Sequence, residues 1–194
     1  MQAARGTPLR TEAIEPIAQR RRNLWWLALV GAVAIAGFDQ ATKGWALGAL
    51  DTGRSIPILG HALRLRLTAN PGAAFSVGAD ATGVFTVVTA AVIVGVVVLV
   101  PRVQSGWWLL AATLVLGGGV GNLIDRLGRE PGFGVGMVVD FIAYGDWFIG
   151  NVADIAIVVA VGLIVVLTLV GTRPWPNPPA SNPPASNPAQ GDLA

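Results

Sequence analysis

The sequence predicts a membrane all-α fold: four transmembrane helices, with a small β element and a loop at the outer face. Its 194 residues are 53% hydrophobic and only 12% charged, with a mean hydropathy of +0.62, whereas ordinary soluble domains carry roughly 25% charged residues. The charges cluster and leave long uncharged runs, which are typical of membrane spans. The chain has no cysteine and a single histidine, His61, which excludes disulfides, thiol catalysis and a zinc site built on paired histidines.

Residues 1–22 are polar and end in the arginine cluster Arg20–Arg22. We expect a disordered cytoplasmic N-terminus, with the arginines marking the cytoplasmic flank of the first helix. The apolar run Leu24–Phe38 is short for a span, which needs about 20 residues. The first helix is therefore expected over residues 24–47. An alanine-rich stretch in it resembles a signal-peptide cleavage site, but the long polar leader favours an anchor.

Three further apolar runs predict the other spans of one membrane domain over residues 23–172, at 81–100, 107–124 and 152–170. Glycines 117–119 and 121 let helix backbones approach closely in a bundle. Residues 173–194 are rich in proline and are expected to be a disordered tail. Four spans with an inside N-terminus put both termini in the cytoplasm.

The predicted outer face carries the irregular segments. Within residues 51–69, apolar and polar residues alternate over Leu63–Thr68, which predicts one or two short strands at the membrane interface. The stretch Asn70–Ser76 follows with turn residues. Residues 127–150 are expected to form an outer loop, whose glycines suit either a mobile flap or a simply flexible connection.

The unusual polar residues all fall at the outer ends of these segments: Asp39, Lys43, Asn70, Asn122, Asp125, Arg126, Asp140, Asn151 and Asp154. Residues so far apart in the sequence can converge only at the outer interface, so they predict a site there. Acids at the edge of a span are costly and favour a functional interpretation.

Several of these residues also have a structural interpretation. Asp154 lies three residues after Asn151, the spacing of a helix cap, and a first-turn acid suits the helix dipole. Asp39 and Lys43 have the spacing of a helical ion pair. Asp140 lies between apolar residues, and nothing local explains its charge. Asp140 is therefore the stronger indication of catalysis.

Two acids that share a proton can hydrolyse an amide by general acid–base catalysis, one taking a proton from water and the other donating to the carbonyl oxygen. No Ser–His or Cys–His arrangement competes with them. Two alternatives remain open. Intramembrane acids also mark ion pathways, so the chain could be a small proton-coupled transporter or channel. The other alternative is a non-catalytic membrane scaffold in which the acids cap helices.

Five sequence blocks in this order resemble the bacterial lipoprotein signal peptidase (signal peptidase II) family: Asp39-x-x-x-Lys43, Asn70-Pro-Gly-Ala-Ala-Phe-Ser76, Gly118-Gly119-Val-Gly121-Asn122-Leu-Ile-Asp125-Arg126, Val138-Val139-Asp140-Phe141 and Asn151-Val-Ala-Asp154. Each block is weak alone, but the ordered set is specific. The resemblance implies a four-helix membrane aspartic peptidase with a small outer β-cradle. It also implies cleavage of prolipoproteins before the diacylglyceryl-modified cysteine.

The resemblance assigns roles to the marked residues. It implies that Asp140 and Asp154 are the catalytic dyad and that Asn151 supports them. It further implies a group that holds the substrate backbone, namely Asn70, Asn122 and Arg126, and a group that braces the site, namely Asp39, Lys43 and Asp125. One departure is visible: the family usually has Phe directly before the Asn of the last block, where this chain has Gly150, with Phe148 two residues earlier.

The same resemblance implies a multi-pass protein of the bacterial cytoplasmic (inner) membrane with its active site at the outer face. Its expected partners are diacylglyceryl-modified prolipoproteins and membrane lipids, with no nucleic acid. No metal or organic cofactor is expected, and we expect the chain to act as a monomer.

Overall fold

The computed structural model describes residues 14–51, 53–72 and 82–175, with side chains described from Leu24 onward. The elements, in chain order, are α1 (Ile14–Ala49), β1 (Ile56–Leu59), β2 (Leu63–Asn70), α2 (Thr82–Leu99), the short 3-10 helix η2 (Val100–Arg102), α3 (Gly106–Gly128), β3 (Val138–Tyr144), β4 (Phe148–Gly150) and α4 (Val152–Leu169). Residues 1–13, most of the turn block after Gly72 and the tail beyond Trp175 lie outside the described residues.

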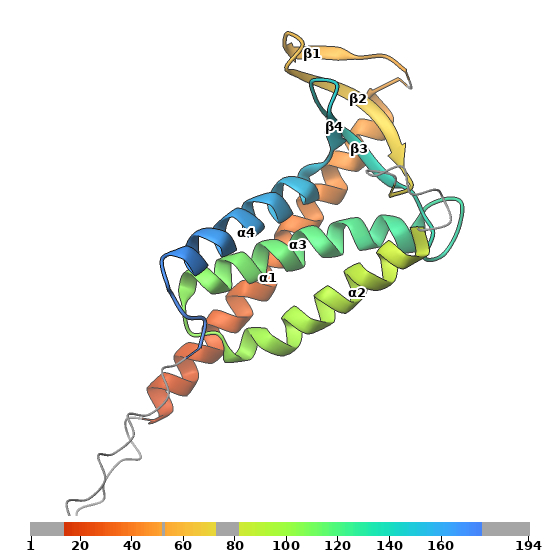
Figure 1. Ribbon diagram of the computed structural model, residues 1–194. Helices are drawn as coiled ribbons and strands as arrows, with labels where there is room; N and C mark the ends of the chain where they lie inside the picture. The colour runs from red at the N-terminus through yellow and green to blue at the C-terminus, as the bar shows by residue number, and fades with distance from the viewer. Residues whose placement is uncertain (1–13, 52, 73–81, 176–194) are drawn as a thin grey trace, which may run out of the picture.

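Four helices are long and apolar enough to cross a membrane. In Figure 1 they run alongside one another, with the sheet beyond one end of the bundle and the start of α1 and the end of α4 at the other end. This arrangement confirms the predicted fold class of four transmembrane helices with a small β element. Helix α3 is central, because it packs against the three other long helices.

The glycine run in α3 explains this central place. A Cβ at Gly117 would lie 2.6 Å from Ile35 Cβ on α1, and a Cβ at Gly118 would lie 2.6 Å from the Ala153 carbonyl oxygen at the start of α4. Any side chain at these positions would push α1 or α4 away. The glycine run therefore lets α1 and α4, which carry polar site residues, approach the backbone of α3 closely, as small residues do in membrane bundles.

Helix α1 starts at Ile14, ten residues before the start expected from the apolar run, so residues 14–22 are helical where disorder was expected. Alanine, glutamine and arginine are good helix formers, and Pro16 lies in the first turn, where proline is tolerated. The apolar part of this helix that could span a membrane is Leu24–Ala49.

The sheet confirms the short strands expected within residues 51–69, which are β1 and β2, and it differs from the expectation at β3 and β4. Its four strands are antiparallel in the order β1-β2-β3-β4, whereas residues 127–150 were expected to be a loop. The stretch Val138–Tyr144 is rich in β-branched and aromatic residues, which favours a strand. Turn residues Gly145 and Asp146 follow it, and they make a hairpin with β4. This stretch forms β3, which lies between β2 and β4 in the sheet. Asp140 is therefore a strand residue and not a loop residue.

Candidate active site

Asp140 lies on the central strand β3, opposite Thr68 of β2, and is 1% exposed. Asn70 Nδ2 donates to Asp140 Oδ2 at 2.8 Å, and Asn151 Nδ2 donates to Asp140 Oδ1 at 2.7 Å. No lysine or arginine of the described chain forms an ion pair with it. A buried carboxyl held by amides is not stabilised in its charged form by a salt bridge.

The electrostatics of Asp140 follow from this burial. Desolvation raises the pKa of the Asp140 carboxyl from its usual 3.8 to about 7, and repulsion by Asp154 adds to the rise. The hydrogen bonds from Asn70 and Asn151 and the charge of Lys43 oppose it. Asp140 is therefore poised to hold or release a proton near neutral pH, as acid–base catalysis requires.

Asp154 lies in the first turn of α4 and closes a capping box with Asn151, which confirms the capping interpretation of their spacing. Asp154 N–H donates to Asn151 Oδ1 at 3.0 Å, and Asn151 N–H donates to Asp154 Oδ2 at 3.1 Å. The other carboxylate oxygen, Oδ1, accepts from Asn122 Nδ2 at 2.9 Å. The cap therefore does not exclude a second role, because it fixes one oxygen of Asp154 and aims the other toward α3.

Two asparagines connect the acids. Asn151 Nδ2, which bonds Asp140, also lies 3.2 Å from Asn122 Oδ1, and Asn122 in turn donates to Asp154. The structure thus brings Asp140, on a strand, and Asp154, on a helix, to the two ends of one amide bridge. The side chains come from β3, α3 and α4 and meet where the sheet adjoins the bundle.

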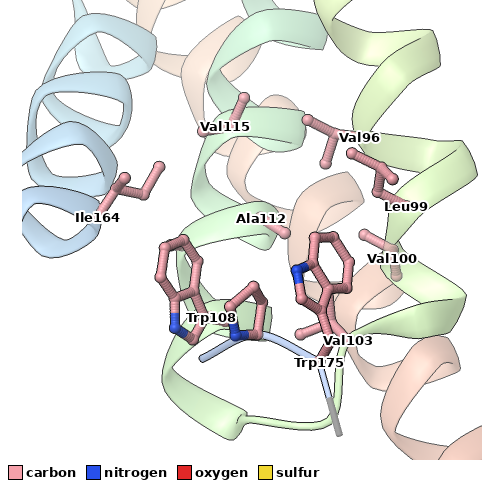
Figure 2. Close-up of a pocket in the computed structure, with 11 residues that line it drawn as sticks. Val96, Leu99, Val100, Val103, Trp108, Ala112, Val115, Ile164 and Trp175 are labelled. Carbon is pink, nitrogen blue, oxygen red and sulfur yellow. The ribbon is translucent and has the colours of Figure 1, made fainter. Parts of the chain in front are cut away.

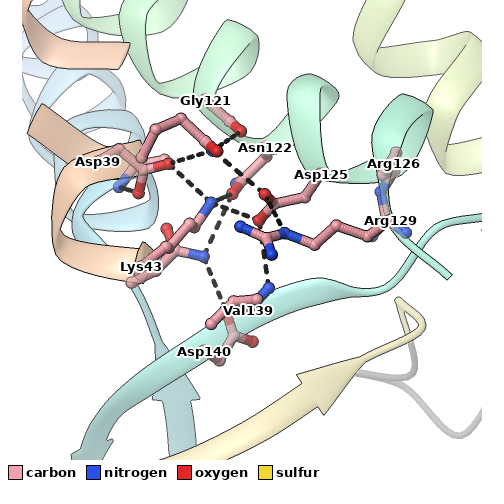
Figure 3. Close-up of polar contacts among 12 residues, drawn as sticks. Asp39, Lys43, Gly121, Asn122, Asp125, Arg126, Arg129, Val139 and Asp140 are labelled. Atoms are coloured by element: carbon pink, nitrogen blue, oxygen red, sulfur yellow. Dashed lines mark hydrogen bonds and ion pairs between the residues drawn. The ribbon is translucent and has the colours of Figure 1, made fainter. Parts of the chain in front are cut away.

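A buried ion-pair network lies beside this bridge (Figure 3). Lys43 Nζ lies 2.7 Å from Asp39 Oδ2 and 2.9 Å from Asp125 Oδ2, and it donates to Asn122 Oδ1 at 3.0 Å. The side chains of Asp39, Lys43 and Asp125 are 0% exposed. Buried charges persist only when they are paired and hydrogen-bonded, and here each of the three is. The ion pair expected from the Asp39–Lys43 spacing is present, and Asp125 joins it from α3.

The two carboxylates of the network each hold the backbone just before a candidate catalytic acid. Asp39 Oδ1 accepts the N–H of Ala153 at 2.9 Å, and Asp125 Oδ2 accepts the N–H of Val139 at 3.2 Å. Ala153 precedes Asp154, and Val139 precedes Asp140. A Cβ at Gly121 would lie 2.7 Å from Asp39 Oδ2, so glycine there leaves room for the carboxylate. The network therefore fixes α4 and β3 relative to α1 and α3.

Arg126 is buried in the last turn of α3, and its Nη1 lies 3.4 Å from the Gly136 carbonyl oxygen, to which it donates. Its Nη2 lies 3.3 Å from where a Cβ on Gly72 would be. The guanidinium thus sits between the segment that leads into β3 and the segment that follows β2. It forms no ion pair with either candidate acid within the described residues.

Two residues of the network were missed from the sequence. Gln40 Nε2 lies 2.9 Å from the Gly121 carbonyl oxygen and 3.2 Å from Asp125 Oδ1. Arg129 Nε lies 2.6 Å from the same Asp125 oxygen. The i,i+4 spacing of Asp125 and Arg129 was the available signal, but it depended on α3 continuing to Gly128, beyond the predicted end at residue 124.

Gly150, the departure from the family pattern, ends β4 and is buried. A Cβ there would lie 2.6 Å from Phe148 Cε1 and 2.8 Å from Asp154 Oδ2. The ring of Phe148 therefore lies against Gly150, close to the Asp154 carboxylate. In this chain the glycine makes room for both groups.

A pocket of about 350 Å³ opens next to Asp140. Its walls come from the end of β2 and from the β3–β4 hairpin, with Asn70, Trp147 and Phe148 among its lining residues. Trp147 is 98% exposed. The pocket therefore presents both polar and aromatic surface next to Asp140.

The other notable pocket, of about 270 Å³, lies at the opposite end of the bundle between α2, α3 and α4 (Figure 2). Its lining includes Val96, Val115, Ile164, Trp108 and Trp175 and contains no titratable side chain. Within the described part of the chain, no three His, Cys, Asp or Glu side chains are grouped as metal ligands would be.

Comparison with known proteins agrees with this geometry. The sequence model of the family "Signal peptidase (SPase) II" matches residues 31–170. A lipoprotein signal peptidase of Rhodococcus jostii is 43% identical over 160 residues, which cover 82% of this chain and 79% of the relative. One from Leifsonia xyli subsp. xyli is 43% identical over 148 residues, which cover 75% of this chain and 68% of the relative.

A solved structure described as a bacterial membrane enzyme, determined by the in meso method at 1.9 Å resolution, has a TM-score of 0.66 and 28% sequence identity to this chain. The match covers 75% of this chain and 94% of the solved one. These findings confirm the family resemblance and favour a peptidase over the transporter and scaffold hypotheses. The chain belongs to the signal peptidase II family and is a membrane-embedded, multi-pass protease with a role in removing signal peptides from lipoproteins.

Proposed function

We propose that Asp140 and Asp154 form the catalytic dyad of an aspartic endopeptidase. The enzyme would cleave prolipoproteins just before their diacylglyceryl-modified cysteine. The observation that carries this proposal is the amide bridge from Asp140 through Asn151 and Asn122 to Asp154. It ties together two acids whose oxygens accept only amide hydrogen bonds among the contacts of the described residues.

The reaction follows from one shared proton. Burial is the main cause that raises the pKa of Asp140 to about 7, so one proton can be held or released by the pair near neutral pH, and the two carboxyls titrate as a unit. The ionised carboxylate accepts a proton from water as the water oxygen bonds to the scissile carbonyl carbon. The neutral carboxyl donates its proton to the carbonyl oxygen. Collapse of the tetrahedral intermediate breaks the C–N bond, and the amine leaves with a proton returned by the dyad.

The surrounding residues would bind and orient the substrate. Asn70 and Phe148 line the pocket next to Asp140, and Asn122 and Arg126 border the same end of α3. A lipid-modified cysteine keeps the scissile bond at the membrane interface, and acyl chains that remain in the bilayer contribute binding energy that positions this bond. Asp39 and Asp125 brace the site, since each accepts the backbone N–H just before one acid. Lys43 braces it by pairing with both carboxylates.

The proposal extends to the placement of the enzyme. With Arg20–Arg22 on the cytoplasmic side, both termini would lie in the cytoplasm of a bacterium, and the dyad would face outward across the inner membrane. The chain would act as a monomer among membrane lipids. The position of the α1 start and the α4 end at one end of the bundle, opposite the sheet, supports this arrangement (Figure 1).

The test is cleavage of a purified diacylglyceryl-modified prolipoprotein, run beside the unmodified precursor. We expect cleavage of the modified form alone, with the modified cysteine as the new N-terminal residue. Asp140→Asn and Asp154→Asn should each abolish cleavage while the variants stay folded, and Asp51→Asn, at an exposed loop position, should cleave normally. Normal processing by either dyad variant would contradict the assignment.

A further inference from the structure

Arg129 reaches back over the last turn of α3 to the ion-pair network (Figure 3). It is the residue after the helix, and its own N–H bonds the Asp125 carbonyl oxygen at 2.9 Å. Its Nε lies 2.6 Å from Asp125 Oδ1, and its side chain is 29% exposed, whereas that of Asp125 is fully buried. Arg129 is therefore the partner through which the buried network reaches the surface.

The two oxygens of Asp125 face different groups. Oδ1 accepts from Arg129 and Gln40. Oδ2 contacts Lys43 Nζ and accepts the N–H of Val139 at 3.2 Å. A carboxylate is planar, so fixing Oδ1 also fixes the direction of Oδ2. Arg129 thereby holds the oxygen that anchors β3 one residue before Asp140.

Arg129 also completes the charge balance. The network contains two carboxylates, Asp39 and Asp125, and two cations, Lys43 and Arg129. Without Arg129, Lys43 would be the one cation in ion-pair contact with these two buried carboxylates among the described residues, and a buried carboxylate that loses an ion-pair partner is costly. The charge of Lys43 is felt at Asp140, since it lowers the pKa of that carboxyl.

Resting on the proposed function, we propose that Arg129 is a positioning residue of the peptidase, acting through Asp125. It orients the Asp125 carboxylate that anchors β3, and it supplies the second cation that keeps the network neutral beside the dyad. The charged groups that act on Asp140 are Lys43 of α1, Arg126 of α3 and Asp154 of α4. Asp39 and Asp125 are the ion-pair partners of Lys43. On β2 the hydrogen-bond partner of Asp140 is the neutral Asn70.

The expected effects concern both rate and pH dependence. Arg129→Gln should lower kcat by about tenfold with KM nearly unchanged, because the acids are misplaced while the pocket remains. It should also move the pH–activity profile to higher pH by about one unit, because the ion-pair network beside the dyad then carries one positive charge less, which favours the protonated dyad. Arg129→Lys keeps the charge and should restore most of the pH profile while it recovers kcat only in part.

The experiment uses the full chain in detergent or nanodiscs and a diacylglyceryl-modified prolipoprotein, with kcat and KM measured from pH 5 to 9. Arg54→Gln is the matched control, since Arg54 is exposed and its Asp51 partner is 3.9 Å away at the surface. Hydrogen exchange of the β3 amides is measured in parallel. Faster exchange at Val139 in Arg129→Gln, but not in Arg54→Gln, reports the anchor independently of catalysis.

Two outcomes would overturn the inference. One is an unshifted pH profile in Arg129→Gln. The other is a lysine variant that titrates like the glutamine variant. A purely structural role would lower the melting temperature and leave the pH profile in place. Failure of the proposed function is distinct, since the wild-type chain would then leave the substrate uncut or Asp140→Asn would remain active.

Discussion

The burial of Asp140 favours its proposed acid–base role and opposes the stability of the fold. Its burial at the centre of β3 raises the pKa of its carboxyl from 3.8 to about 7, so the folded chain keeps a proton that the unfolded chain releases. Between about pH 4 and pH 7 the folded state therefore binds more protons than the unfolded state, and stability falls as pH rises. The loss across this window is on the order of 3 kcal/mol.

This linkage predicts a difference in the pH dependence of unfolding. The melting temperature of the wild-type chain in detergent should fall as pH rises from 4 to 7, and the fall should be shallower in Asp140→Asn, which has no proton to lose. Asp51→Asn, at a side chain that is 84% exposed, should retain the wild-type slope. An equally steep fall of the melting temperature in Asp140→Asn would show that another group releases the proton.

Gly150 gives a second prediction at the residue scale. A Cβ there would lie 2.8 Å from Asp154 Oδ2 and 2.6 Å from the Phe148 ring, so Gly150→Ala should displace the carboxylate. We expect kcat to fall roughly tenfold to hundredfold, measured in the same cleavage assay. Gly162→Ala in α4 is the control, since nothing lies within 4 Å of a Cβ at that position, and its activity should be normal. Full activity of Gly150→Ala would mean that the Phe148 ring moves aside freely.

At the scale of elements, the junction between α3 and β3 determines where Asp140 lies. Gly136 passes beneath the end of α3, where its N–H bonds the Arg126 carbonyl oxygen at 3.0 Å. A Cβ on Gly136 would collide with the Asp125 carbonyl oxygen and would lie 2.8 Å from the Arg129 carbonyl oxygen. Met137 N–H then bonds the Glu130 carbonyl oxygen at 2.9 Å. The segment leading into β3 is thus held against the helix end.

Gly136→Ala should therefore separate β3 from α3. We expect a loss of about 2 to 3 kcal/mol in stability and a large loss of cleavage, measured by thermal unfolding and by the prolipoprotein assay. Gly128→Ala, in the last turn of α3 with open space around it, should be neutral or slightly stabilising because alanine favours a helix. If both variants have the same stability and the same cleavage activity, the close approach of Gly136 to the end of α3 does not contribute to stability.

At the scale of the whole molecule, the two ends of the helix bundle differ in what they carry. The sheet and the polar network occupy one end, and the turn between α2 and α3 lies at the other, where Gln104 N–H bonds the Pro174 carbonyl oxygen at 2.9 Å. If Arg20–Arg22 mark the cytoplasmic side, the sheet faces outward. The cysteine-free chain allows this orientation to be tested with single introduced cysteines.

We expect His61→Cys, between β1 and β2, to react with a membrane-impermeant maleimide in intact cells. Gln104→Cys should react only after the cells are permeabilised. Both positions are exposed, so accessibility alone does not separate them, and each variant should retain cleavage activity. Labelling of Gln104→Cys in intact cells would contradict the proposed orientation.

The local pattern of the sequence was enough for much of the fold. Uncharged runs predict spans, because a helix in lipid must satisfy its own backbone and cover it with apolar side chains. The spacing of Asp39 and Lys43 predicts their ion pair, and that of Asn151 and Asp154 predicts the cap. Strands β3 and β4 were missed because a short apolar run with one acid has no clear periodicity, and β2, the other partner of β3, lies far away along the chain.

The sequence by itself thus determined the membrane class, the four spans and the identity of the polar residues at their ends, because hydropathy and helix geometry act over neighbouring residues. Only the tertiary structure decided which of these residues meet. The carboxyl of Asp140 accepts hydrogen bonds from Asn70 of β2 and from Asn151 at the start of α4. The neighbouring Val139 N–H donates to Asp125 of α3, which fixes the backbone before Asp140. Such contacts arise from packing around the glycines of α3 and from strand register, and neither is encoded in the spacing of adjacent residues.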